Sequence, residues 1–410
     1  MLYDPKDAAT IADPYPALAH LRRHDPVHWS DRLGGWVLTR FDDVKRALND
    51  RSLSADRITP FLDHLDEAER VRVANLGEMM QRWAVFRDPP DHTRLRGLMN
   101  KAFTGRALEV LVPRIETIVD TLLDDLIRQG SGGREVDFIK HFAYPLPATV
   151  IAAMVGVPDV DLDRFKSWSD DLAAFVGSAQ VTPDKYDRAE AAVADMTDFF
   201  TRIIEERRAR PAVEGDGTII DALIAAEDRG DVLSESELVA CCVLLLFAGH
   251  ETTTNLFGSG LHALFRHPEV HRDLRSAPEK AEAAVEEFLR YNGPIGAMTR
   301  IVAAPCRYGE RDLKPGQRVF CMIHAANRDP AVFPDPDRLN IDRPENRHVV
   351  FGYGIHFCIG APLARLEGRI AFDRLMRRTQ AIAPAEADPP WNDSLVLRGL
   401  LRLPVSITAA

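Results

Sequence analysis

The 410-residue chain has few of the features that mark secreted or membrane-spanning proteins. Its five cysteines are an odd number and lack the paired spacing of a disulfide framework. The start of the sequence has neither the basic residues nor the apolar stretch of a signal peptide. The longest apolar run, residues 238–249, would extend about 18 Å as a helix, short of the roughly 30 Å of a bilayer. We therefore expect a soluble, cytoplasmic protein that does not enter a membrane.

Excess positive charge is also lacking. The chain has 51 Lys and Arg against 62 Asp and Glu, a formal net charge of −11. This balance disfavours nonspecific nucleic-acid binding through a global positive field. The 46% hydrophobic and 28% charged residues are typical of a compact globular chain, which at this size buries roughly three quarters of its extended surface. Such a core is large enough to enclose a ligand.

No repeat, low-complexity tract or linker divides the sequence, which predicts one domain over residues 1–410. Two short β-type runs flank Gly34-Gly35 and predict a hairpin, after which helical periodicity dominates. Predicted helices cover residues 108–127, 138–155, 161–176, 184–208, 234–266, 277–291 and 361–378. Predicted strands cover 27–30, 36–39, 298–302, 318–322 and 395–407. The sequence therefore predicts a mainly α fold with small β-sheets.

The predicted helix over 234–266 is unusual in its middle. Ser234 and Glu237 form a capping-box pattern at its start, and a length of roughly 50 Å would take it across the whole protein. Residues 248–254 then place Gly, His, Glu and Thr at a centre that should be buried. A conflict between local propensity and burial tends to mark a functional site. The segment is not a zinc motif, because the second histidine of His-Glu-x-x-His is missing.

A second candidate site is the glycine-rich stretch 351–360, which precedes the helix predicted over 361–378. Glycines permit positive φ angles and a close approach to a flat ligand. Cys358 lies just ahead of that helix, where amide dipoles stabilise a thiolate, so it is a candidate anionic metal ligand. The other four cysteines are expected to be reduced packing residues.

This stretch resembles the haem-binding loop of the cytochrome P-450 family of haem-thiolate monooxygenases, and further motifs occur in the family's order along the chain. The resemblance implies haem b, with an axial thiolate from Cys358, lying between the long central helix and the helix after the loop. It also implies that cations bind the haem propionates. The matching loop reads Phe351-Gly352-x-Gly354-x-His356-x-Cys358-x-Gly360, and the implied haem contacts are His92, Arg96, Ala248, Gly249, Arg300, Phe351, His356 and Gly360.

The segment Ala248-Gly249-x-Glu251-Thr252 resembles the family's oxygen-binding segment. The resemblance implies that Glu251 relays protons and that the Thr252 hydroxyl holds water and protons near bound dioxygen. Gly249 is expected to leave room for dioxygen. The implied reaction inserts one atom of dioxygen into a substrate, by hydroxylation or epoxidation. Two alternatives are a haem-thiolate peroxygenase and a non-catalytic haem gas sensor.

Glu287 and Arg290 resemble the family's Glu-x-x-Arg pair on one helix face. In the family this pair is buried and contacts an arginine from the irregular stretch before the cysteine loop. By position, that arginine would be Arg338, which is followed by a leucine where an aromatic residue is more usual. The resemblance therefore implies a structural role for all three residues.

The resemblance also implies a substrate pocket with mainly apolar walls. We expect a hydrophobic substrate of moderate to large size, such as a terpenoid, steroid or polyketide. The candidate pocket residues are Trp83, Val85, Leu244, Ile295, Gly296, Ala297 and Val396.

The chain has no flavin-binding or iron–sulfur segment, so its electrons must come from other proteins. The resemblance implies a ferredoxin and a ferredoxin reductase, with docking near Cys358, and we expect a monomer. A local basic patch could bind an acidic donor. Its candidate residues are Arg94, Lys101, Arg365 and Arg369.

Overall fold

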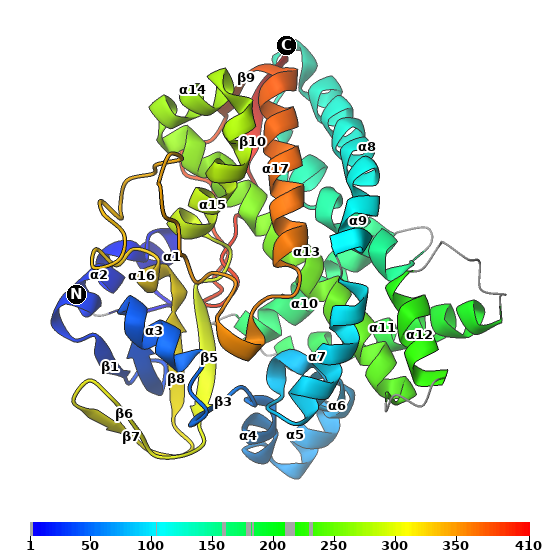
Figure 1. The fold of residues 1–410 in the computed structure, drawn as a ribbon, viewed down its shortest axis with the longest axis vertical. Coiled ribbons are helices and arrows are strands. Elements are labelled where there is room, and N and C mark those ends of the chain that lie inside the picture. Colours follow the sequence, from blue (N-terminus) through cyan, green and yellow to red (C-terminus); the bar gives the residue numbers. More distant parts are fainter. Residues whose placement is uncertain are drawn as a thin grey trace. The chain divides into compact units, whose positions relative to one another are not determined.

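The computed structural model describes residues 3–103, 105–157, 161–177, 182, 184–209, 218–228 and 233–410, in which helices alternate with sheets of five, three and two strands (Figure 1). The mainly α fold with small sheets is confirmed. The backbone groups into two compact units. The first unit contains the chain up to Leu53, Val112–Pro147 and Glu251–Ala410, and the second contains Ser54–Leu111 and Ala148–His250. One domain over the whole chain stays a prediction.

The largest sheet lies in the first unit, apart from Ser54 at the end of β3, and has the strand order β1-β2-β8-β5-β3. The predicted N-terminal hairpin is confirmed, with Trp29 opposite Trp36. Strand β8 is parallel to β2 and antiparallel to β5. Gly35 is required there, because a Cβ on it would lie 2.8 Å from the Arg318 carbonyl oxygen. The strands are β1 (Val27–Ser30), β2 (Gly35–Leu38), β3 (Leu53–Ser54), β5 (Ala297–Val302) and β8 (Arg318–Met322).

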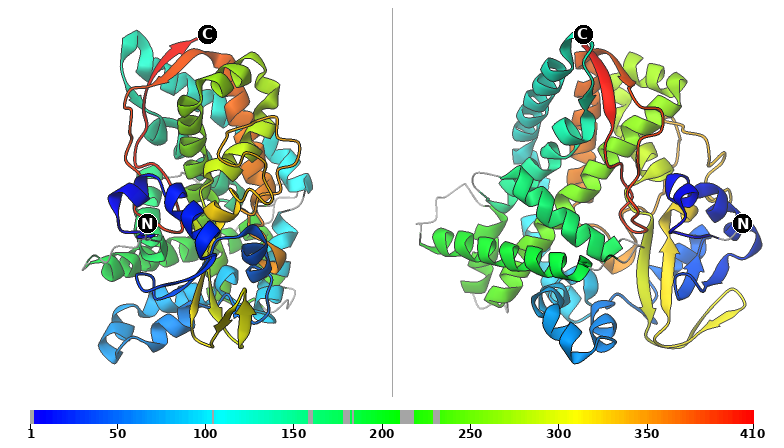
Figure 2. Two further views of the ribbon diagram at one scale, coloured as in Figure 1. Left: turned by 90° about the vertical axis from the view of Figure 1, so that its left-hand side faces the viewer. Right: turned by 180° about the vertical axis from the view of Figure 1, so that it is seen from behind.

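Two smaller sheets complete the first unit. The C-terminal strand β10 runs between β9 and β4, and its pairing with β9 is visible in Figure 2. The prediction of one strand over 395–407 is partly wrong, because the early residues form only the bridges Ile295↔Leu397 and Trp391↔Leu400. The strands are β4 (Val136–Asp137), β9 (Thr379–Pro384), β10 (Pro404–Ala409), and the hairpin β6 (Cys306–Tyr308) with β7 (Arg311–Leu313).

Helix α17 (Ala361–Arg378) has the predicted bounds and packs against α15 (Ala281–Asn292) (Figure 1). The rings of Phe288 and Phe372 lie 4.9 Å apart at this contact. Gly368 brings the helices close, because a Cβ there would lie 2.9 Å from Val285 Cγ2. The other helices of the first unit are α1 (Ala8–Ala12), α2 (Tyr15–His24), α3 (Phe41–Ala47), η2 (Ser131–Gly133), η3 (Ile139–Ala143), α14 (Pro268–Ser276), η4 (Pro278–Lys280), α16 (Ile323–Ala326) and η5 (Gly354–His356).

The second unit is helical within the residues described for it. Helix α11 packs on α10 and α6, and Glu190 of α11 accepts hydrogen bonds from the backbone N–H groups of Asn75 and Leu76. The predicted helices over 161–176 and 184–208 are confirmed within one residue at each end. The helices are α4 (Ile58–Asp63), α5 (Glu67–Arg72), α6 (Ala74–Gln81), η1 (Ala84–Phe86), α7 (Asp91–Ala102), α10 (Leu162–Gly177), α11 (Lys185–Arg208) and α12 (Ile219–Asp228).

Three helices belong partly to each unit: α8 (Gly105–Gly130), α9 (Pro145–Val155) and α13 (Glu235–Arg266). The predicted capping box of α13 is present, since the Ser234 N–H donates to Glu237 Oε2 over 2.9 Å and the Glu237 N–H donates to Ser234 Oγ over 3.3 Å. Among the described residues, α13 is long and apolar enough to cross a membrane by length and composition. However, 72% of its apolar window is buried, as expected for a core helix.

Candidate active site

The cysteine loop is a closed turn that leads into α17. The Cys358 N–H donates to the Phe351 carbonyl oxygen over 2.8 Å, which joins the two ends of the loop. Gly352 and Gly354 have φ angles of 76° and 73°, in the left-handed region that favours glycine. A Cβ on Gly354 would also lie 2.2 Å from Asn49 Oδ1. Gly352 and Gly354 are therefore required by the backbone of this loop.

One side of this loop exposes sulfur and apolar groups together. Cys358 is exposed, as are 49% of Ile355 and 41% of Phe357. A Cβ on Gly360 would lie 3.9 Å from Cys358 Sγ, an ordinary van der Waals distance, so Gly360 lies directly beside the sulfur. An exposed thiol at a helix N-terminus, set among apolar side chains, fits a soft ligand to the iron of an apolar group such as haem.

The other four cysteines are poorer candidates for an anionic ligand. Cys241, Cys242 and Cys321 are buried, and Cys306 is half-buried. Burial raises the pKa of the Cys241 thiol to about 12 and that of Cys321 to about 11, and it also raises the pKa values of Cys242 and Cys306. These thiols therefore stay protonated near neutral pH.

The centre of α13 presents a face that is less buried than the turns around it. Ala248 is exposed and Glu251 and Thr252 are half-buried, whereas the preceding run from Leu238 to Phe247 is buried. The spacing i, i+3 and i+4 places these three residues on one face of the helix. Asn255 Nδ2 donates to Glu251 Oε1 over 3.3 Å and orients that carboxylate. The helix therefore offers a carboxylate and a hydroxyl side by side.

Gly249 has a reason to be glycine that differs from the predicted one. A Cβ on Gly249 would lie 2.6 Å from Ile151 Cγ1, so the missing side chain lets α13 approach α9. Beside it, His250 is fully buried with Nδ1 2.7 Å from the Leu246 carbonyl oxygen, and burial lowers its pKa to about 4. A haem contact by Gly249 stays a prediction, but helix packing explains the residue type.

Two of the four predicted propionate-binding residues lie in each unit. His92 and Arg96 lie on α7 in the second unit, and Arg96 Nε donates to Asn100 Oδ1 over 3.1 Å. Burial, followed by the nearby charge of Arg96, lowers the pKa of His92. Arg300 on β5 and His356 in η5 lie in the first unit. Arg300 is only 6% exposed, and its Nη1 donates to the Thr299 carbonyl oxygen over 3.0 Å. Propionate binding by Arg300 stays a prediction.

Glu287 and Arg290 form a fully buried, two-bonded ion pair. Arg290 Nε donates to Glu287 Oε2 and Arg290 Nη2 to Oε1, each over 2.8 Å. The prediction that the Arg338 side chain contacts this pair is wrong. Arg343, not Arg338, reaches the carboxylate, with Nε donating to Glu287 Oε2 over 3.2 Å. The Arg338 side chain is exposed, and its backbone carbonyl accepts from Arg290 Nη2 over 3.2 Å. The loop contacts the pair first through backbone groups at Arg338 and then through the side chain of Arg343. Residue spacing alone does not predict this path.

Predicted pocket residues from two distant segments of the first unit lie together. The Gly296 N–H donates to the Val396 carbonyl oxygen over 3.0 Å, next to the bridge between Ile295 and Leu397. A Cβ on Gly296 would lie 2.5 Å from the Leu395 carbonyl oxygen, so a side chain there is excluded. Ala297 is fully buried in a core cluster of the first unit.

The remaining pocket candidates lie in the second unit. The Trp83 ring is buried and stacked 5.8 Å from Phe86 and 5.9 Å from Phe247. Its indole Nε1 is buried with no hydrogen-bond partner among the described residues. Leu244 on α13 is buried, whereas 44% of Val85 is exposed. Trp83 therefore packs as a core residue, and a role in substrate binding stays a prediction.

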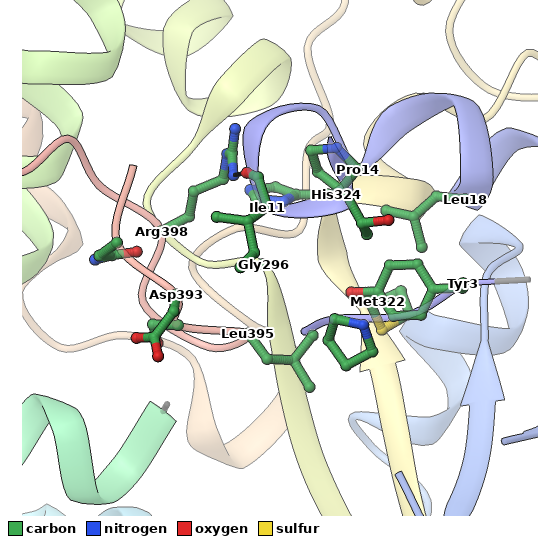
Figure 3. Close-up of a pocket in the computed structure, with 14 residues that line it drawn as sticks. Tyr3, Ile11, Pro14, Leu18, Gly296, Met322, His324, Asp393, Leu395 and Arg398 are labelled. Atoms are coloured by element: carbon green, nitrogen blue, oxygen red, sulfur yellow. Dashed lines mark hydrogen bonds between the residues drawn. The ribbon is translucent and has the colours of Figure 1, made fainter. Parts of the chain in front are cut away.

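A cavity in the first unit is lined in part by Gly296, one of the predicted pocket residues (Figure 3). Gly296 and Leu395 line it together with Tyr3 and Arg398. Its volume of about 30 Å³ suits one or two water molecules rather than an organic substrate. Arg398 closes one side and is tied to the N-terminal segment, because Nη2 donates to the Ala12 carbonyl oxygen over 2.8 Å.

Comparison with known proteins identifies one family over nearly the whole chain. The Cytochrome P450 family matches residues 36–408. "Polyketide biosynthesis cytochrome P450 PksS" of Bacillus subtilis is 37% identical, covering 100% of this chain and 99% of the relative. The solved structure of PksS has a TM-score of 0.85 and 36% identity, covering 99% of this chain and 100% of that chain.

Two further relatives are comparably similar. "Cytochrome P450 107B1" of Saccharopolyspora erythraea is 42% identical, covering 97% of this chain and 96% of the relative. "Vitamin D(3) 25-hydroxylase" of Pseudonocardia autotrophica is 39% identical, covering 96% and 94%.

The chain belongs to the cytochrome P450 family. It is a cytochrome P450 monooxygenase, and its cofactor is haem b with a cysteine thiolate as axial ligand to the iron. The family resemblance read from the sequence is thereby confirmed.

Proposed function

We propose that this monooxygenase hydroxylates or epoxidises a hydrophobic small molecule of terpenoid, steroid or polyketide size, with electrons from a ferredoxin and its reductase. The observation that carries the proposal is the exposed sulfur of Cys358 at the start of α17, in a loop closed by its own amide bond to Phe351. It is the one exposed thiol among the five cysteines, all of which the structure describes. We propose Cys358 as the axial ligand on this ground.

Haem b, when bound, supplies the activation of dioxygen that the family's chemistry requires. The chain's own part is to hold the cofactor and to manage protons. We propose that cationic side chains bind the two propionates through charge-assisted hydrogen bonds. Arg300 is buried, where a charge-assisted hydrogen bond to a propionate would be stronger than at the surface. The proposed propionate-binding residues are His92, Arg96, Arg300 and His356.

Proton delivery falls to Glu251 and Thr252. A threonine hydroxyl can accept one hydrogen bond while donating another, so it can pass a proton to dioxygen or to a water held beside it. Glu251 lies one residue earlier on the less buried face of α13, where a carboxylate can change orientation and carry protons inward. The hydrogen bond from Asn255 gives Glu251 one defined resting orientation.

The proposed substrate class rests on apolar character and on the relatives. The paired segments around Gly296 and Val396 present backbone and aliphatic groups. One relative's name places it in polyketide biosynthesis, and another's gives vitamin D(3) as its substrate. Polyketides and vitamin D(3) are both large and largely apolar molecules. We propose the same broad class for this chain.

The proposed electron donor is a ferredoxin that docks near Cys358. Two of the four candidate basic residues form ion pairs within the chain. Arg94 pairs with Glu237, and Arg365 pairs with Glu286, so each contributes less positive field than its formal charge suggests. Arg369 on α17 is exposed. The side chain of Lys101 lies outside the described residues. Of the four candidates, Arg369 is therefore the best supported.

The proposed working form is a single-domain, soluble, cytoplasmic monomer. The extensive burial of α13 supports a core role for the helix whose composition would allow it to cross a membrane.

Substrate-induced change in the Soret band of the purified holoenzyme tests the proposed class. Binding of a substrate beside the haem would change the spin state of its iron, so a panel of terpenoids, steroids, macrolactones and small charged metabolites can be titrated in parallel. We expect saturable spin-state shifts from apolar compounds of moderate to large size. Shifts from small charged compounds alone would contradict the apolar-pocket proposal.

A further inference from the structure

Glu286 and Glu287 are adjacent on α15 and serve different parts of the chain. Glu287 is buried with Arg290 and Arg343, as described above. Glu286 faces α17 and the residues just before the cysteine loop. Arg365 donates to it with two parallel bonds, from Nε to Oε1 over 2.7 Å and from Nη2 to Oε2 over 3.0 Å. His348 Nε2 lies 3.2 Å from Oε2.

The carboxylate of Glu286 is firmly ionised. Burial alone would raise its pKa, but the hydrogen bonds and charges of His348 and Arg365 outweigh burial and lower the pKa to about 2. Because Oε2 is a carboxylate acceptor, Nε2 of His348 must carry the proton of this contact. The two-bonded geometry fixes the plane of the Arg365 guanidinium, which a single point contact would not do.

Both partners of Glu286 lie against the ring of Phe351. The guanidinium carbon of Arg365 is 4.6 Å from the ring centroid, and the His348 ring is 5.9 Å away at an interplanar angle of 49°. The backbone of Phe351 is in turn the acceptor for the Cys358 amide over 2.8 Å. A short chain of contacts therefore connects one carboxylate on α15 to the backbone of the sulfur-bearing residue. All five residues lie in the first unit.

We propose that Glu286 is a positioning residue for the axial thiolate. It holds Arg365 over the ring of Phe351 and His348 beside it, and this fixes the loop whose carbonyl receives the Cys358 amide. The inference rests on the proposed role of Cys358 as iron ligand. The guanidinium stacked on Phe351 is also a positive charge on the same side of the loop, so the carboxylate balances charge as well as geometry.

The test compares variants of the purified holoenzyme without substrate. Glu286→Gln keeps size but removes the charge that orients Arg365. Arg365→Lys keeps the positive charge but loses the planar, two-bonded stacking group. Glu386→Gln is the matched control, since Glu386 makes the same two-bonded contact with Arg402, over 3.0 and 2.9 Å, with neither residue in the cysteine loop. The readouts are the midpoint potential, the fraction of the reduced carbon-monoxide complex with the thiolate-type Soret band, and the thermal unfolding midpoint.

We expect Glu286→Gln to shift the one-electron reduction equilibrium toward the reduced form by about threefold or more, because an unbalanced Arg365 favours the added electron. We expect the thiolate-type fraction to fall in both Glu286→Gln and Arg365→Lys, and Glu286→Asp to restore part of it. Glu386→Gln should match the unsubstituted enzyme in midpoint potential and in thiolate-type fraction. The thermal unfolding midpoint checks that each variant is folded. Should Glu286→Gln fail to fold, Arg365→Lys still decides the question.

Two results would overturn the inference. One is an unchanged thiolate-type fraction in Arg365→Lys, because the planar group held by Glu286 would then not position the loop. The other is an equal loss in the Glu386→Gln control. By contrast, absence of the thiolate-type band in the unsubstituted enzyme would contradict the proposed ligand itself, so the two failures are distinguishable.

Discussion

The carboxylate of Glu287 and the guanidinium of Arg290 meet through two 2.8 Å hydrogen bonds, with both side chains completely buried. Around them, the backbone N–H of Asn340 donates to Glu287 Oε1 over 2.8 Å, and Arg290 Nη1 donates to the carbonyls of Asn327 and Pro336. The pair thus anchors the irregular segment that precedes the cysteine loop. A buried charge left without its partner is far more costly than an exposed one.

Glu287→Gln should therefore lower the free energy of unfolding by about 3–5 kcal/mol, because two buried guanidinium groups lose their anion. Chemical denaturation followed by circular dichroism measures this loss. Arg343→Ala should also destabilise strongly, whereas Arg338→Ala should stay within about 0.5 kcal/mol because that side chain is exposed. A larger loss for Arg338→Ala than for Arg343→Ala would contradict the assignment of Arg343 as the third member of the cluster.

Thr252→Ala should uncouple reductant use from product formation. The variant keeps the apolar surroundings, so substrate binding and electron uptake should persist, but without the hydroxyl more of the oxygen should leave as hydrogen peroxide. Parallel measurement of reductant, product and peroxide gives the yield. Thr252→Ser retains a hydroxyl and should recover much of the coupling. An unchanged product yield per reductant in Thr252→Ala would remove this role.

Gly249→Ala should destabilise the protein through a steric conflict with Ile151, whose Cγ1 would lie 2.6 Å from the new Cβ. Ile151→Ala alone should cost about 2–5 kcal/mol, because it leaves a cavity. If the two residues compete for one space, the double variant should be more stable than the sum of the single losses, by about 0.5–3 kcal/mol. Additive losses in unfolding free energy would show that another contact requires the glycine.

His324 should make stability depend on pH. It is buried with Nε2 2.8 Å from the Gly293 carbonyl oxygen, and burial, together with the charges of Arg398 and Arg328, lowers its pKa from 6.5 to about 3. Between these values the unfolded chain binds a proton that the folded protein does not. Stability attributable to His324 is therefore complete above about pH 6.5 and falls as the pH drops toward 3, by about 1.4 kcal/mol per pH unit.

Unfolding free energies measured between pH 7 and pH 5 test this dependence. His324→Gln retains an amide donor. It should reduce the slope of unfolding free energy against pH by up to about 1.4 kcal/mol per pH unit, the contribution of one proton, whatever its effect on stability at pH 7. His250, His262 and His271, whose pKa values are also lowered to about 4 by burial, should still contribute to the pH dependence in this variant. An unaltered slope in His324→Gln would mean that this histidine is not neutral in the folded protein.

Much of the fold followed from the sequence because local signals and burial agree there. Helix α17 begins after Gly360 and ends at Arg378 as predicted, and the capping box of α13 forms as its residue types require. The predicted helix over 138–155 is instead divided into the π-helix η3 and α9, because apolar periodicity does not distinguish hydrogen bonding to residue i−5 from bonding to i−4.

The candidate site followed from the sequence where motifs carry fixed spacing, as around Cys358. Contacts that depend on how distant segments of the chain pack together could not be predicted from the sequence. Arg338 and Arg343 are both plausible partners for Glu287 until the loop's path is known. Glu286 appears in the sequence as an ordinary helix-surface acid, and only the position of α17 beside α15 brings Arg365 to it.

The most direct test of the account concerns the ligand to the iron. Cys358→Ala and the matched control Cys306→Ala should be purified with haem, reduced, and exposed to carbon monoxide. The account predicts that Cys306→Ala keeps the thiolate-type Soret band and that Cys358→Ala loses it completely. Persistence of that band in Cys358→Ala would show that another residue holds the iron and would contradict the central claim.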